Sequence, residues 1–326
     1  MLLWCAVVTA QATDERKAVE AVATKALDAV PGDSAFVFTR VLTTTVEPLY
    51  GVHAEQRLAV GSSFKLFILG RLIDDVNTGR RRLSDTMVLQ RTLHGPPQSE
   101  MASWPVGSPV ALHTLALKMI WISDNTATDH LHFLLGRERI EQQMQAMGHG
   151  DPSVNRPLLS TREMTILRDK KLGSPGIAYQ KMTEGQKRAY LAKQFGTDPD
   201  YAQLDFDTNA YKLAEWYASP LDMAQSLAWI YHNTGDAKPA HALRAVLTVD
   251  PKLKYDPAVW TFVGFKGGSE DQLLAGNWLL RHRNGNWYTF HCYFNNPEGE
   301  IKPEQVLPVM ETILRAIEPT LEKAKP

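Results

Sequence analysis

Three short polar motifs in the chain carry the residue types that nucleophilic catalysis needs. Ser62 and Lys65 form an S-x-x-K motif at the start of an apolar segment, and a spacing of three places the hydroxyl and the amine on one helical face. A serine becomes a nucleophile when a base takes its proton, and a lysine amine is a base once burial or a nearby cation lowers its pKa. By itself, the motif more often marks a capping serine followed by a lysine that reaches solvent.

The second and third motifs lie further along the chain. Ser123-Asp124-Asn125 stands 61 residues beyond Ser62, between two predicted helices, where such a tripeptide is usually a helix-capping turn. Lys266-Gly267-Gly268-Ser269 follows an apolar predicted strand. Glycines there allow a substrate to lie against the strand as an added edge, although the segment alone is typical of a turn that ends a strand.

The order S-x-x-K, S-D-N and K-x-G resembles the serine β-lactamase and penicillin-binding protein superfamily, and the class A-like branch most closely. The resemblance covers roughly residues 13–317 and includes Thr126-Ala127 and the segment Ser219 to Ala224. It implies an α/β (α+β) fold of the β-lactamase type, with a five-stranded antiparallel sheet flanked by helices and an all-helical lobe.

The resemblance also implies a role for each matching residue. Ser62 would be the nucleophile, Lys65 its base or proton relay, and Ser123 the group that passes a proton to the leaving atom. Lys266 would supply positive field and keep the Lys65 pKa low. Asn125 would bind a side-chain amide of the substrate and help to fix Lys65.

Further substrate contacts follow from the same resemblance. The backbone N–H groups of Ser62 and Ser269 would form the oxyanion hole, where each donor is typically worth about 10²–10³ in rate. Gly268 and Ser269 would line the strand edge against which the substrate lies. Trp104 precedes the S-D-N helix and would stand at the pocket mouth, although a tryptophan that packs within the lobe is the commoner situation.

Two departures from the family pattern indicate an atypical branch, similar to relatives that act on esters. Gly267 replaces the hydroxyl residue usual in K-T-G, which helps to bind the carboxylate of β-lactams. The E-x-x-L-N motif that activates the deacylating water is absent, and Glu163 is the only carboxylate in the corresponding stretch, residues 155–164. Glu163 is therefore the candidate deacylation base, the alternative being an acid that complements a helix dipole.

Composition limits the function further. The chain has 326 residues, a net charge of -1 and 44% hydrophobic residues, which argues against binding to nucleic acid or to a membrane surface. No apolar stretch is long enough to span a bilayer. With only two cysteines, a disulfide framework and a Cys-rich zinc site are excluded. We expect a monomer that needs no metal or organic cofactor and that acts on a small-molecule acyl substrate.

The N-terminus has some features of a secretory signal. Leu2 to Ala10 is apolar, and Ala10-Gln11-Ala12 has the A-x-A pattern of a cleavage site, but no basic residue precedes the apolar run. We therefore expect residues 1–12 to be a signal peptide and the protein to be periplasmic or secreted. The alternatives are a frayed first helical turn and a buried N-terminal strand.

Periodicity predicts one catalytic domain over residues 13–326. Its α/β lobe covers about 13–60 and 213–326, and its helical lobe covers about 61–212, with a polar insertion at about 168–209. Helices are predicted at 13–30, 63–76, 110–122, 126–147, 158–167, 220–232 and 303–317. Strands are predicted at 35–41, 49–54, 260–265, 273–281 and 287–294, with a turn at Glu47-Pro48.

Three remaining features have ordinary explanations. His130 and His132 diverge by about 200° around a helix, so they cannot easily share a metal. Arg281 and Arg283 lie on the predicted strand beside the K-G-G strand and could receive a carboxylate, although solvent-facing strand arginines are commoner. The segment Arg80 to Arg82 is most simply a solvated loop.

Taken together, the three motifs and the resemblance predict hydrolysis of a β-lactam amide through a Ser62 acyl-enzyme. The alternatives are an esterase or D-alanyl peptidase-like enzyme and a penicillin- or peptidoglycan-binding module with poor turnover.

Overall fold

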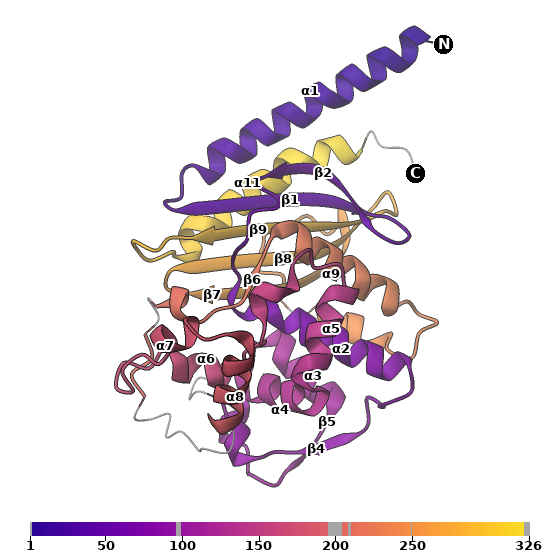
Figure 1. Ribbon diagram of the computed structural model, residues 1–326. Helices are drawn as coiled ribbons and strands as arrows, with labels where there is room; N and C mark the ends of the chain where they lie inside the picture. Colours follow the sequence, from indigo (N-terminus) through magenta and orange to yellow (C-terminus); the bar gives the residue numbers. More distant parts are fainter. Residues whose placement is uncertain (1, 96–98, 195–203, 208–209, 249, 323–326) are drawn as a thin grey trace.

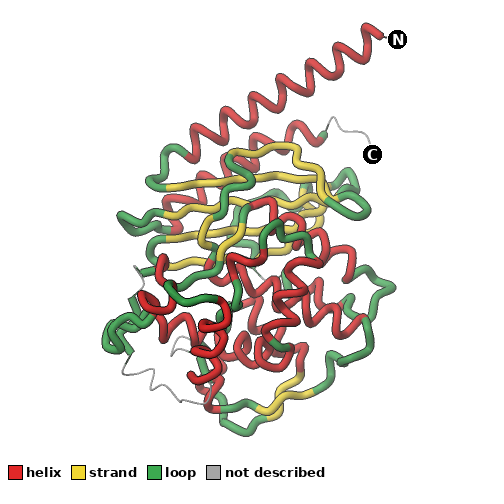
Figure 2. The backbone as a smooth tube through the Cα atoms, viewed as in Figure 1, coloured by secondary structure: helices red, strands yellow, loops and turns green. Residues whose placement is uncertain are grey.

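The computed structural model describes residues 2–95, 99–194, 204–207, 210–248 and 250–322, with side chains from residue 14 onward. Two lobes are evident in Figure 2, one built on strands and the other almost wholly on helices. Parts of the predicted insertion at 168–209 lie outside the described residues. The described remainder contains two short helices, α7 (Gly176–Gln180) and α8 (Glu184–Gln194).

The central sheet confirms the predicted five antiparallel strands. Its order is β2-β1-β9-β8-β7, and every neighbouring pair is antiparallel. Segments from the two ends of the chain thus lie side by side, because β1 pairs with β9 along its length (Figure 1). The strands are β1 (Asp33–Val41), β2 (Val46–Val52), β7 (Trp260–Glu270), β8 (Leu273–His282) and β9 (Trp287–Asn295).

Two terminal helices cover one face of this sheet, namely α1 (Leu2–Leu27) and α11 (Pro303–Leu321). Apolar side chains at helical spacing, such as Val19, Ala23 and Leu27 of α1, pack there with the aromatic side chains of the strands. The N-terminal part of α1 projects beyond the sheet (Figure 1). The first described residues are therefore helical, so the alternative of a buried N-terminal strand is wrong. Within the described part of the chain, no helix is long and apolar enough to cross a membrane.

The other face of the sheet contacts the helical lobe through α9 (Pro220–Asn233), which begins at the capping box of Ser219 and Asp222. Behind α9 lies α2 (Lys65–Asn77), which is buried on nearly all sides, as its apolar sequence predicts. The remaining α-helices are α3 (Leu112–Trp121), α4 (Asn125–Leu135), α5 (Arg137–Ala146), α6 (Thr161–Leu167) and α10 (Ala242–Ala245). Short elements complete the fold: β3 (Leu58–Ala59), β4 (Thr86–Val88), β5 (Pro109–Ala111), β6 (Tyr217–Ala218), and the 3₁₀ turns η1 (Gly61–Phe64), η2 (Arg91–Leu93), η3 (Glu100–Ser103), η4 (Pro152–Asn155) and η6 (Tyr211–Leu213).

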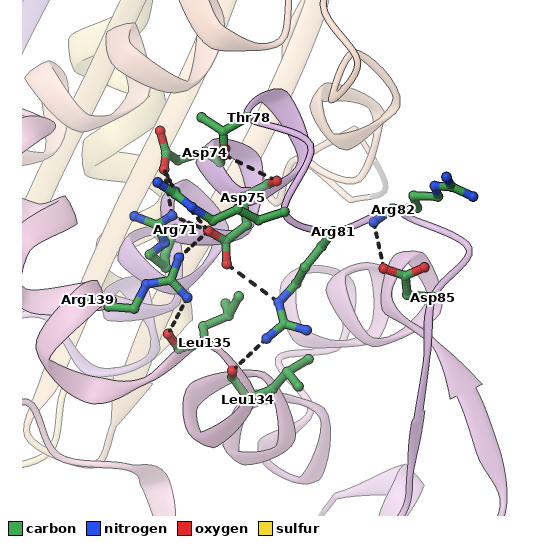
Figure 3. Close-up of polar contacts among 11 residues, drawn as sticks. Arg71, Asp74, Asp75, Thr78, Arg81, Arg82, Asp85, Leu134, Leu135 and Arg139 are labelled. Carbon is green, nitrogen blue, oxygen red and sulfur yellow. Dashed lines mark hydrogen bonds and ion pairs between the residues drawn. The ribbon is translucent and has the colours of Figure 1, made fainter.

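An ion-pair cluster anchors the far end of α2 (Figure 3). The Asp75 carboxylate is inaccessible to solvent and pairs with Arg71 of its own helix, with Arg81 and with Arg139 of α5. Burial alone would raise the pKa of Asp75, but the hydrogen bonds and charges of Arg71 and Arg139 outweigh burial and hold it below its usual value. Arg80 also pairs with Asp74, and both Arg80 and Arg82 are exposed, as expected for a solvated loop.

Several predicted boundaries were wrong for local reasons. The helix predicted at 126–147 is two helices, α4 and α5, because Gly136 adopts a φ of 86° and ends the first. The predicted turn at Glu47-Pro48 lies inside β2, where Pro48 pairs with Thr39 and stands next to a shift in register between Phe38 and Thr39. The strand predicted at 260–265 continues to Glu270. The third motif is therefore part of an edge strand and not a turn after one.

Candidate active site

The predicted nucleophile, Ser62, lies in η1, the 3₁₀ turn that leads from β3 into α2. Its side chain is half-buried, whereas Ser63 and Phe64 beside it are buried. The Phe64 ring stacks on Trp216 with 3.8 Å between ring centroids and so fixes the turn against the segment that leads into β6. This packing holds the Ser62 hydroxyl at the opening of a cavity.

Lys65, at the first position of α2, lies completely out of solvent. Its Nζ donates to the Ser123 carbonyl at 2.6 Å, to Ser123 Oγ at 2.9 Å and to Asn125 Oδ1 at 2.8 Å. Burial, and secondarily the Lys266 charge, hold the pKa of Lys65 well below its ordinary value, although the nearby carboxylates of Asp129 and Asp124 oppose this. A buried amine with a depressed pKa can take a proton from a neighbouring hydroxyl.

Lys266 of β7 reaches the same point from the other lobe. Its Nζ lies 3.1 Å from Ser123 Oγ, so one hydroxyl oxygen stands between two lysine amines. Burial lowers the pKa of Lys266 to about 7. Residues separated by 204 positions, from Ser62 to Lys266, therefore come together as the motif order predicted.

The S-D-N turn holds Ser123 in an uncommon backbone conformation. Ser123 has a φ of 59°, which a residue other than glycine adopts only when its surroundings fix it. The next residue, Asp124, caps α4 by accepting from the Ala127 N–H, and also accepts from Ser99 Oγ and from the Met101 N–H. The middle residue of the motif therefore anchors the turn to the loop before α3, which frees Ser123 and Asn125 to point at Lys65.

A close approach of β7 to the Ser62 turn builds a second part of the site. A Cβ on Gly268 would lie only 2.6 Å from the Ser62 nitrogen, so only glycine fits at this position. A Cβ on Gly61 would similarly lie 3.3 Å from the Ser269 nitrogen. The backbone nitrogens of Ser62 and Ser269 thus belong to adjoining segments, as an oxyanion hole requires.

A buried amide that the motifs did not indicate supports both segments. Asn277 of β8 is fully buried and donates to Ser63 Oγ at 2.8 Å and to the Lys266 carbonyl at 3.0 Å. Its Oδ1 accepts from Tyr293 at 2.6 Å and lies 2.8 Å from His291 Nδ1. Asn277 therefore links the residue after Ser62 to the strand that carries Lys266. The only signal in the sequence is one polar residue inside an apolar strand pattern.

Glu163 lies in a different environment from the candidate nucleophile. Its carboxylate makes a two-pronged ion pair with Arg137, at 2.6 and 3.0 Å, and closes the capping box of Ser160 at the start of α6. It does not line the cavity that Ser62 lines. This placement agrees with the alternative that Glu163 complements the dipole of α6. Among the described contacts of Glu163, none is with Ser62, so none supports a role in deacylation.

Trp104 and the two histidines are also apart from the candidate nucleophile. The Trp104 ring packs on the core of the helical lobe and over the Lys118 amine, and it is not among the residues that line the cavity at Ser62. His130 and His132 are both fully buried, and burial lowers the pKa of each. Among the described residues, no group of three or more His, Cys, Asp or Glu side chains is placed to hold a metal.

The cavity beside Ser62 has a volume of about 530 Å³ and runs along β7. Ser62, Ser123, Lys266, Gly268 and Ser269 form its polar end. Most of its remaining lining is apolar and comes from the end of α3, from β7 and β8, from residues 246, 247, 250 and 252, and from α11. A nucleophile, two amines and paired N–H groups beside one cavity could carry out acyl transfer on a bound carbonyl compound.

Comparison with solved structures identifies the fold. A β-lactamase from Sphaerobacter thermophilus DSM 20745 aligns with 94% of this chain and 98% of its own, at a TM-score of 0.65 and 17% identity. PBP-A aligns with 96% of this chain and 97% of its own, at 0.63 and 16%. The TLA-1 extended-spectrum β-lactamase aligns with 94% of this chain and 99% of its own, at 0.67 and 12%. The predicted β-lactamase-like fold is thus confirmed.

No curated protein matches the sequence significantly. The family model for the β-lactamase enzyme family, by contrast, matches residues 16–248, well over half of the chain. That match includes the S-x-x-K and S-D-N motifs, and β7 with Lys266 lies beyond it. On this match and the shared fold, the chain belongs to the β-lactamase enzyme family.

Proposed function

We propose that the protein is a serine acyl-hydrolase that works through an acyl-enzyme at Ser62, with the amide of a β-lactam as the leading substrate class. The observation that carries the proposal is the meeting of Lys65 and Lys266 at Ser123 Oγ, at 2.9 and 3.1 Å, beside the cavity that Ser62 lines. Such a chain of hydroxyl and amine groups is what proton transfer to a leaving nitrogen needs.

In the first half of the reaction, neutral Lys65 takes the Ser62 proton as Ser62 Oγ bonds to the carbonyl carbon. The N–H groups of Ser62 and Ser269 stabilise the resulting oxyanion. The C–N bond then breaks, and the nitrogen receives a proton from Ser123, which the lysine amines replace. In the second half, water adds to the acyl carbon, the bond to Ser62 Oγ breaks, and the serine regains its proton.

Lys266 and Asn125 bind the substrate in this scheme. Lys266 in its charged form attracts an anionic group, and its charge helps to keep Lys65 neutral. Asn125, held by the Lys65 amine through its Oδ1, keeps its NH₂ group for a carbonyl of the substrate. Gly268 and Ser269 offer the strand edge.

Three reagents separate the possible reactions. The protein and its Ser62→Ala variant are incubated with a chromogenic cephalosporin, with a p-nitrophenyl ester and with a fluorescent penicillin. We expect cephalosporin turnover by the wild type and none by the variant. Ester turnover without cephalosporin turnover would identify an esterase instead. Equal activity of the variant with every reagent would refute the Ser62 acyl-enzyme.

A second candidate, a penicillin- or peptidoglycan-binding protein with poor turnover, is favoured by the position of Glu163. Asp250 is the only carboxylate among the described residues that line the cavity, and it pairs with Lys252. A site without a free carboxylate next to the acyl bond deacylates slowly. A penicillin adduct on Ser62 that persists for hours, seen by intact-protein mass, would select this candidate.

We also propose export to the periplasm or the medium, on the A-x-A pattern at residues 10–12. Expression of the full chain in a bacterium with a cleavage-competent secretion pathway tests this. Mature protein that begins at Thr13 supports the proposal, whereas intact protein retained in the cytoplasm contradicts it.

A further inference from the structure

The cavity beside Ser62 is much larger than its catalytic end. Its volume of about 530 Å³ lies within the roughly 300–1,000 Å³ typical of sites for small organic ligands. Beyond the polar end, its walls come from Phe265 and Trp278 of the sheet, from Leu307 and Met310 of α11, and from Val246 and nearby residues. The cavity therefore passes around the edge strand β7 toward the face that α11 covers.

Two facing glycines shape this apolar part. Gly267 pairs with Gly276 across β7 and β8. A Cβ on Gly267 would meet the Phe265 ring at 2.6 Å, and a Cβ on Gly276 would overlap the Trp278 ring. The two rings lie 4.9 Å apart between centroids and cover the glycine pair. Gly267, which replaces the hydroxyl residue of K-T-G, thus lies under the Phe265 and Trp278 rings, which form one wall of the cavity.

The mouth of the cavity is apolar as well. Trp121 and Ile122, directly before Ser123, are 48% and 40% exposed and line the cavity. Large hydrophobic side chains side by side at a cavity rim are typical of a binding surface for apolar ligands. Two hydrogen bonds hold Leu247 and Pro251 against the sheet. The Phe265 N–H donates to the Leu247 carbonyl, and Trp278 Nε1 donates to the Pro251 carbonyl.

The cavity lining carries few charges, and the unpaired one is at the catalytic end. Of the described lining residues, only Lys266, Asp250 and Lys252 are ionisable with full charges, and the last two pair with each other. A substituent in the apolar part would therefore meet no free cation there. Burying a carboxylate without a partner is costly, whereas burying methylene groups or a ring is favourable.

We propose that this apolar part binds a neutral, apolar substituent of the acyl donor, an alkyl chain or an aromatic ring, and so makes apolar esters or amides the preferred substrates. The inference rests on the proposed acyl-enzyme at Ser62 and names its substrate class. Each methylene that leaves water for the cavity raises kcat/KM about threefold to fourfold, until the cavity is filled.

Two ester series test this specificity. One is a set of p-nitrophenyl esters from acetate to octanoate, and the other a set of S-alkyl thioacetates with chains of increasing length, because the substituent can be on either side of the reacting carbonyl. Leu307→Trp fills the cavity from α11, and Leu307→Asp adds a charge without bulk. Thr312→Trp places the same indole at an exposed position of α11 and is the matched control.

We expect kcat/KM to rise with chain length in at least one series, and the rise to be lost in both Leu307 variants and kept in Thr312→Trp. A flat profile in both series, or a rise that survives both Leu307 variants, would overturn the inference. If Ser62 is acylated but the profiles are flat, the inference fails while the proposed function stands.

A binding measurement keeps the inference independent of turnover. The neutral fluorophore N-phenyl-1-naphthylamine is titrated into Ser62→Ala protein, with and without Leu307→Trp. We expect saturable binding to one site that Leu307→Trp weakens at least about tenfold and Thr312→Trp does not. Absence of saturable binding would show that the cavity takes no apolar ligand, whatever the chemistry at Ser62.

Discussion

At the scale of single residues, the charge of one buried lysine, Lys266, lowers the pKa of the other, Lys65. Lys65 is useful as a base only in its neutral form, and burial together with the positive charge of Lys266 keeps its pKa low. Lys266 itself has a pKa of about 7 because it is buried. The charge of Lys266 therefore disfavours a second positive charge on Lys65 beside Ser123.

This coupling predicts a shift in a pH profile. Lys266→Met removes a positive charge next to Lys65, so the Lys65 pKa rises and a higher pH is needed to keep Lys65 neutral. We expect the acidic limb of the acylation rate to move to higher pH, measured by stopped flow with a chromogenic cephalosporin. Lys254→Met, an exposed lysine beyond the cavity lining, should leave the limb in place. An unmoved or lowered midpoint in Lys266→Met would refute the coupling.

At the scale of elements, the contact between β7 and η1 sets the geometry of the site. Gly268→Ala would drive a methyl group into the backbone of the Ser62 turn, which cannot move without moving the nucleophile. Displacing a reacting group by about 1 Å can cost about 10² in rate, so we expect acylation to fall at least that far.

Gly267→Ala is the comparison for this prediction, because its methyl group would meet the edge of the Phe265 ring and the Ala275 carbonyl oxygen but not the Ser62 turn. Acylation rates of the two variants, with circular dichroism to check folding, decide the matter. Equal losses in both variants would show that the close approach of Gly268 has no special role.

The α2 helix carries Lys65 at one end and the Asp75 cluster at the other. Asp75→Asn leaves Arg71 and Arg139 without their buried partner, and we expect the free energy of unfolding to fall by about 3–5 kcal/mol. The carboxylate of Asp74, in contrast, is 31% exposed, and Asp74→Asn should cost about 1 kcal/mol or less. Urea denaturation of both variants measures the difference, and similar values would contradict the burial argument.

The Asp75 cluster also makes a pH prediction. Because the pKa of Asp75 is lowered in the folded protein, its stabilisation is complete above the unfolded value of 3.8 and is lost as pH falls through the folded value. The stability gap between the wild type and Asp75→Asn should therefore narrow in acid. A gap that stays constant between pH 7 and pH 3 would show that charge is not its source.

The sequence predicted those features that local spacing determines. The S-x-x-K and S-D-N motifs indicated that Ser62 begins a helix and that Ser123 lies between two helices. Apolar, β-branched and aromatic runs, with the Asn-Gly turn, indicated the strands. Partners far along the chain left no such pattern: nothing local shows that Glu163 pairs with Arg137, or that Asn277 bridges Ser63 and β7. The sequence did not indicate the cavity either, because residues of α11 come to line it only in the folded protein.

At the scale of the whole molecule, the site exists only where the two lobes meet. The helical lobe contributes Lys65 and the S-D-N turn, while the sheet contributes Lys266 and Ser269 from its edge strand. Identity to β-lactamases of the same fold is as low as 12–17% in the structures compared. The overall fold is thus shared with these structures although few residues are identical.

The most direct test of the account is the rate at which a penicillin acylates Ser62, with the modified peptide identified by mass spectrometry. We predict one adduct on the peptide that contains Ser62, formed at least about 10² more slowly in Lys65→Ala. An adduct on another residue, or an equal rate without the Lys65 amine, would contradict the central claim that these groups act as one catalytic centre.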